Sequence, residues 1–93
     1  MNVSTLVLAS TVADLKKAIS LDKNQWRAIK TLTELYNSRF EFSKGLETVE
    51  PFYKNHTDNY IMGMLYAKTL IHNKKYAQAD QLLATLNIIP FEG

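Results

Sequence analysis

The chain has few residues whose types and spacing suit catalysis or metal binding. Its two histidines, His56 and His72, lie sixteen positions apart, and neither has a carboxylate beside it at ligand spacing. A zinc site needs three or four such ligands converging on one point. Glu47 and Glu50 lie three apart on a predicted helix, where we expect a solvated face. Paired carboxylates that act in acid–base catalysis need a pocket that raises one pKa, and a surface helix offers none.

Composition excludes further kinds of chemistry. The chain has no cysteine, which rules out disulfides, thiolate catalysis and sulfur-rich metal sites. It also lacks a glycine-rich phosphate loop, a nucleophile elbow and a pair of zinc ligands on a helix. The net charge of +2 is small and dispersed, whereas a nucleic-acid site needs a basic stripe or patch. We therefore predict a protein that is not an enzyme, needs no cofactor or metal, and binds no nucleic acid.

The apolar residues are spread too thinly for a membrane span. No run approaches the roughly eighteen apolar residues that such a span requires. The first ten residues, MNVSTLVLAS, are partly apolar but carry no basic residue, so they resemble a helix start more than a signal peptide. We expect a cytoplasmic protein without a membrane partner.

Hydrophobic periodicity predicts an all-α fold with about five helices. In the first, Leu8, Val12, Leu15 and Ile19 recur at spacings of three and four, as on one stripe of a helix. No segment alternates apolar and polar residues for long, so strands are not expected. The predicted helices cover about 4–22, 25–38, 41 to near 51, 58–73 and 76–87.

Local signals suggest how these helices end. Pro51 lacks a backbone donor and is expected to end or bend the third helix. Thr57 or Asp58 is expected to cap the fourth helix, and Asn73 to close it in the left-handed conformation. The fourth helix is apolar nearly all round, which predicts burial on more than one side.

A pattern recurs after thirty-four residues. The stretch Leu35–Asn59 overlays on Thr69–Gly93 without a gap, and this period is typical of one family of helix–turn–helix repeats. The overlay pairs Tyr36 with Leu70, Phe42 with Tyr76, Gly45 with Ala79, Val49 with Leu83, and Phe52 with Leu86.

On these residues the chain resembles the tetratricopeptide repeat, with two divergent units at 26–59 and 60–93. The resemblance implies one domain, a short right-handed α-solenoid of stacked antiparallel hairpins. Residues 1–25 would form either a capping helix or half a repeat. Phe40 and Lys74 stand where the turn inside a unit often has glycine, and Thr33 replaces a small residue.

The resemblance also implies that the first helices of the units line a concave groove that holds a peptide or helix of another protein. By family position, the groove residues are Arg27, Lys30, Glu34, Asn37, Ile61, Met64, Lys68, Ile71 and His72. A carboxylate clamp is not expected, because Glu34 stands where such a clamp needs Asn. Ile61, Met64 and Ile71 either form an apolar groove or pack against another helix of the same protein.

Three functions remain open. The first is a protein-interaction module, and the second a small chaperone-like or assembly subunit that sequesters an aggregation-prone partner, such as a secretion component. The third is a structural segment of a longer repeat array, or a homodimer. An uncovered apolar end at Ile88, Ile89 and Phe91 favours further helices or a partner at this end.

Overall fold

The computed structural model describes residues 12–87, and this part of the chain contains helices and no strand. The helices are α2 (Val12–Leu21), α3 (Trp26–Ser38), α4 (Phe42–Asn55), α5 (Tyr60–His72) and α6 (Tyr76–Asn87). They confirm the predicted all-α fold, and the bounds of α3, α5 and α6 are close to those expected. Leu8 and the apolar end at Ile88, Ile89 and Phe91 lie outside the described residues.

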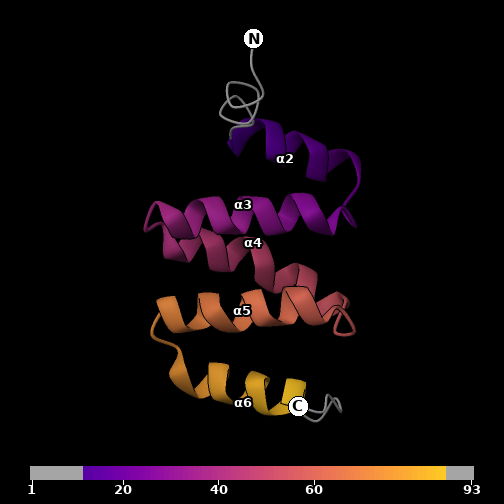
Figure 1. The fold of residues 1–93 in the computed structure, drawn as a ribbon. Helices are drawn as coiled ribbons and strands as arrows, with labels where there is room; N and C mark the ends of the chain where they lie inside the picture. The colour runs from indigo at the N-terminus through magenta and orange to yellow at the C-terminus, as the bar shows by residue number, and fades with distance from the viewer. Residues whose placement is uncertain (1–11, 88–93) are drawn as a thin grey trace.

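The helices stack one after another in chain order, each reversing the direction of the one before (Figure 1). Every helix contacts its neighbours in sequence, and α3 also contacts α5. The arrangement is a short solenoid-like stack. The connections at residues 39–41 and 73–75 lie together on one edge, which we call the turn edge. Residues 22–25 and 56–59 form the opposite edge, which we call the hinge edge.

Burial is concentrated in the middle of this stack. Helix α5 contacts α3, α4 and α6, and seven of its thirteen residues are buried. This confirms that α5 is covered on more than one side. By contrast, no residue of α2 is buried. The most completely buried side chains come from α3, α4 and α5: Thr33, Val49, Met62, Thr69 and Leu70.

The turns inside the two hairpins have the same backbone geometry. Phe40 and Lys74 both adopt φ of 62°, the left-handed region that glycine favours. The N–H of Glu41 donates to the carbonyl of Tyr36, and the N–H of Lys75 to that of Leu70, both at 2.9 Å. The thirty-four-residue period of the sequence is therefore also a period of the backbone.

The hinges between hairpins repeat in the same way. The N–H of Gln25 donates to the carbonyl of Asp22, and thirty-four residues later the N–H of Asn59 donates to that of His56, both at 3.0 Å. In each hinge, the carbonyl of the residue just before the helix, Gln25 or Asn59, then accepts the first hydrogen bond of that helix. Only the second hinge has a side-chain cap, because Asn59 Oδ1 accepts from the N–H of Met62 at 3.1 Å.

Three expectations about helix ends need correction, the first only in part, because Pro51 was expected either to end or to bend its helix. Helix α4 does not end at Pro51 but continues to Asn55. Because Pro51 has no N–H, the carbonyl of Glu47 lacks its usual intrahelical hydrogen bond. Glu47 and Pro51 are exposed, so water can donate to this carbonyl instead. Phe52 and Tyr53 are buried and anchor the next turn of the helix.

The other two concern α5. Asn59, rather than Thr57 or Asp58, caps its start. At its end Asn73 has φ of −92°, and the left-handed residue is Lys74, one position later. Across residues 12–87, no helix has the length and apolar character that crossing a bilayer requires.

Candidate functional site

An exposed stripe runs along α5 on the side not covered by the rest of the stack. Ile61, Met64, Lys68 and Ile71 recur at spacings of three and four, so they share one face of the helix. Of its apolar members, Ile61 is 50% exposed, Met64 is 42% exposed and Ile71 is 44% exposed. Within residues 12–87 no helix covers this stripe, and the alternative of packing inside the same protein is not realised there.

Helix α3 lies beside α5 and contributes charged side chains. Lys30 Nζ contacts Glu34 Oε2 at 3.0 Å, one helical turn apart. The Arg27 guanidinium lies 4.5 Å from the centre of the Trp26 ring. Lys68 on α5 has no ion-pair partner among the described residues. This ammonium therefore lies unneutralised between exposed apolar side chains.

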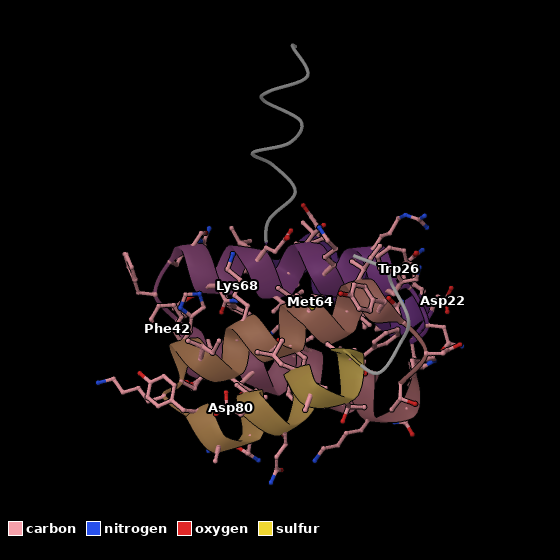
Figure 2. All side chains as sticks on the ribbon, turned by 60° about the horizontal axis from the view of Figure 1, so that its bottom comes forward. Asp22, Trp26, Phe42, Met64, Lys68 and Asp80 are labelled. Atoms are coloured by element: carbon pink, nitrogen blue, oxygen red, sulfur yellow. The ribbon has the colours of Figure 1, made fainter. Side chains whose placement is uncertain are left out.

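A hollow of about 270 Å³ opens between α3 and α5. It is lined by Glu34, Asn37, Ser38, Leu65, Lys68 and His72, and so brings together four of the groove residues predicted from the sequence. Figure 2 shows Lys68 and Met64 following one another along this side, between Phe42 at one end and Trp26 at the other. We call this surface the α3/α5 face.

Asn37 is placed differently from the other predicted groove residues. Its side chain is half-buried, and Nδ2 donates to Thr69 Oγ1 at 3.0 Å. The Thr69 hydroxyl in turn donates to the carbonyl of Leu65 at 2.8 Å. Asn37 Oδ1 is buried without a hydrogen-bond partner, and it lies against Gly45. Asn37 therefore links α3 to α5 at the floor of the hollow.

His72 ends the hollow as a packing residue. It is half-buried at the end of α5, and its ring stacks on Phe42 with centres 4.5 Å apart and planes 3° from parallel. The Phe42 ring is also perpendicular to the Phe40 ring, with centres 5.8 Å apart. Because Phe42 begins α4, this stack joins the two hairpins at the turn edge.

A second hollow of about 480 Å³ lies where the α3/α5 face reaches the hinge edge. Its apolar wall includes Trp26 and Ile61, and His56 stacks on Phe52 at 4.1 Å. The other lining residues are Asn24, Phe52, Asp58, Asn59 and Tyr60. Ile61 was predicted as a groove residue, whereas Trp26 was not, and Trp26 is half-buried against the core.

Glu50 is not on a solvated face, contrary to the expectation from its spacing to Glu47. It is half-buried, and Oε2 accepts a hydrogen bond from the Tyr66 hydroxyl at 2.5 Å. Burial, then this hydrogen bond and the carboxylate charge, raise the pKa of Tyr66 above its ordinary value. Burial and the nearby charge of Asp58 raise the pKa of Tyr53. These groups join α4 to α5 and face no open site.

No protein-family model matches this chain, and neither does any curated protein or solved structure.

Proposed function

We propose that this protein is a tetratricopeptide-like interaction module that binds a segment of another protein on the α3/α5 face. One observation carries the proposal: Ile61, Met64 and Ile71 are each about half exposed in one stripe of α5, the helix that is otherwise the most buried. Contiguous exposed apolar side chains mark interaction surfaces on soluble proteins.

The chemistry of the stripe indicates what kind of segment would fit. Methionine adapts its shape to different apolar partners, and isoleucine supplies a firm apolar surface. Lys68 lies one helical turn from Met64 and has no ion-pair partner within residues 12–87. A segment with apolar side chains and a carboxylate one turn away would cover the stripe and neutralise Lys68.

Peptide selection can test this function without knowledge of the natural partner. A random peptide library would be selected on the wild-type protein and on a variant with Ile61→Ser, Met64→Ser and Ile71→Ser. These positions are exposed, so the variant should keep the helical circular dichroism signal and melting temperature. We expect one group of peptides that combine apolar and acidic residues to be enriched on the wild type and lost on the variant. Equal enrichment of every selected peptide on both proteins would contradict the proposal.

A charge variant separates the roles of the lysines. Lys68→Glu and Lys30→Glu together should weaken capture of the selected peptides and leave folding unchanged, because both side chains are at least partly exposed. Lys16→Glu with Lys17→Glu, at exposed positions of α2, is the matched control. Loss of folding in the Lys30 and Lys68 variant would instead assign those residues a structural role.

The repeated hinge supports the structural alternative as a second proposal. The hydrogen bonds between α2 and α3 match those between α4 and α5. We propose that α2 corresponds to the second helix of a unit, so that the stack comprises two units and a half. A consensus first helix fused ahead of α2 in this register should raise the melting temperature. An unchanged melting temperature would favour a simple capping helix.

A further inference from the structure

Phe40 combines two unfavourable features in one residue. Its backbone has φ of 62°, where an L-residue has its Cβ too close to the next carbonyl oxygen. Its side chain is 80% exposed, the highest value among the large hydrophobic residues of the described chain. The ring therefore contributes little burial to offset the strained backbone. Glycine or asparagine would form the same turn more easily.

Local contacts do not explain why a phenylalanine occupies this turn. The Phe40 ring is perpendicular to the Phe42 ring, with centres 5.8 Å apart. Phe42 is already held by the His72 ring and by Asn73, whose Nδ2 donates to the Phe42 carbonyl at 2.9 Å. This second layer fixes the platform on which Phe40 lies. A rigid platform under an exposed aromatic ring is suited to contact with another molecule.

The same edge is rich in cations without partners. Arg39 precedes Phe40, while Lys74 and Lys75 directly follow Asn73 in the matching turn. All three are exposed and have no ion pair among residues 12–87. The acidic Glu41 is held by Lys44 at 3.6 Å. Tyr76, 57% exposed, extends the aromatic surface into the second hairpin.

We propose that the turn edge is a second docking surface, separate from the α3/α5 face, for an acidic protein segment that carries a large apolar side chain between carboxylates. The apolar side chain covers the Phe40 ring, and the exposed Tyr76 ring offers a second apolar contact on the same edge. The flanking carboxylates meet Arg39, Lys74 and Lys75, and guanidinium and ammonium groups pair well with carboxylates. This inference does not depend on the function proposed for α3 and α5.

A defined probe tests the proposal. The probe is a fluorescent peptide with Leu-Phe between two pairs of Glu, and its binding is measured by anisotropy against wild type and Phe40→Gly. We expect Phe40→Gly to weaken binding about tenfold or more, as for loss of a central aromatic contact. The variant should fold at least as stably as wild type. Phe40→Asn, which also tolerates the left-handed turn, provides an independent second variant. Unchanged binding by both variants would overturn the proposal.

Three controls separate the alternatives. A peptide with Lys in place of each Glu should not bind, and binding of the acidic probe should fall as salt is raised. A Met64→Ser and Lys68→Glu variant should bind the probe like wild type; a loss there with Phe40→Gly unaffected would move the site to the α3/α5 face and overturn the proposal. Binding to vesicles of phosphatidylcholine and phosphatidylserine in equal parts, without peptide binding, would assign the edge to a lipid surface and also overturn it.

Discussion

The two hairpins, α3–α4 and α5–α6, share a backbone but differ in the side chains that occupy equivalent places. In the first, Gly45 has no Cβ, and the Asn37 carboxamide fills the space, turned inward towards Thr69. In the second, Ala79 supplies a buried methyl group at the matching position, and Ile71 is 44% exposed. The same geometry thus places a polar link to the neighbouring hairpin at one position and an exposed apolar side chain at the equivalent position of the other hairpin.

A second difference concerns how much each first helix is covered. Helix α3 lies between α2 and α4, but α2 has no buried residue, and α3 has four. Helix α5 lies between α4 and α6 and has seven. The centre of stability therefore lies between α4 and α5, and the apolar stripe on α5 is displayed from the most firmly packed element.

The largest expected effect tests this difference in packing. Leu70 is 1% exposed, and Leu70→Ala should reduce the free energy of unfolding by about 2–5 kcal/mol because it leaves a cavity in the core. The matched change in α2, Leu15→Ala at a half-buried site, should cost about 1 kcal/mol or less. Urea unfolding measures both values. Equal losses would contradict the assignment of the core to α4 and α5.

The next largest effect tests whether the Asn37 side chain fills the space that Gly45 leaves by having no Cβ. A Cβ on Gly45 would lie 2.5 Å from Asn37 Oδ1, so Gly45→Leu should overpack this contact and cost about 1–3 kcal/mol. Ala79→Leu should cost a similar amount, since Ala79 is 1% exposed.

A double-mutant cycle sharpens the same test. Gly45→Ala alone should destabilise the chain, whereas in an Asn37→Ala background the same change should cost much less, because the clashing oxygen is absent. Additive losses in thermal melts would show that Asn37 and Gly45 do not interact in this way.

The interface between the hairpins should weaken at high pH. The pKa values of Tyr53 and Tyr66 are raised in the folded chain, so above the ordinary tyrosine pKa of about 10 the unfolded chain loses these protons first. Stability should then be constant below that pH and fall as the pH rises above it. Urea unfolding at pH 7 to 11 measures this dependence.

Substitutions identify the source of that dependence. Tyr66→Phe should reduce the loss of stability at high pH, while Tyr76→Phe, at an exposed position, should leave it unchanged. An equally steep loss in Tyr66→Phe would show that Tyr66 is not the titrating group.

The smallest effect compares the two left-handed turns. Phe40→Gly and Lys74→Gly relieve the φ of 62°, a gain of about 1–2 kcal/mol that the greater freedom of glycine in the unfolded chain partly offsets. Each change should leave stability equal or raise it by about 1 kcal/mol at most. A marked loss with Phe40→Gly alone would show that the ring stabilises the fold.

The sequence predicts the helices and the positions of both turns well, because periodicity and the thirty-four-residue overlay depend on local pattern. It does not predict that α4 passes Pro51, since the packing of Phe52 and Tyr53 outweighs the lost donor only in the folded state. Nor does it predict the inward turn of Asn37, which depends on Thr69, thirty-two residues away.

The candidate site was likewise predicted only in part. Ile61, Met64 and Lys68 were predicted as groove residues from their positions in the repeat that the chain resembles, and they lie on one exposed stripe. His72 was also predicted as a groove residue, but its stacking on Phe42 depends on how the two hairpins meet. These details depend on packing between residues far apart in the chain, which the pattern of a single sequence does not reveal.

The most direct test of the central claim is amide chemical-shift mapping of the ¹⁵N-labelled chain during titration with a peptide selected on the wild-type protein. Binding on the α3/α5 face predicts the largest shifts at Ile61, Met64 and Lys68 on α5, with smaller ones at Lys30 and Glu34 on α3. The amides of α2 and α6 should remain nearly unchanged. Shifts concentrated on α2 or α6, with the α5 stripe unaffected, would contradict the claim.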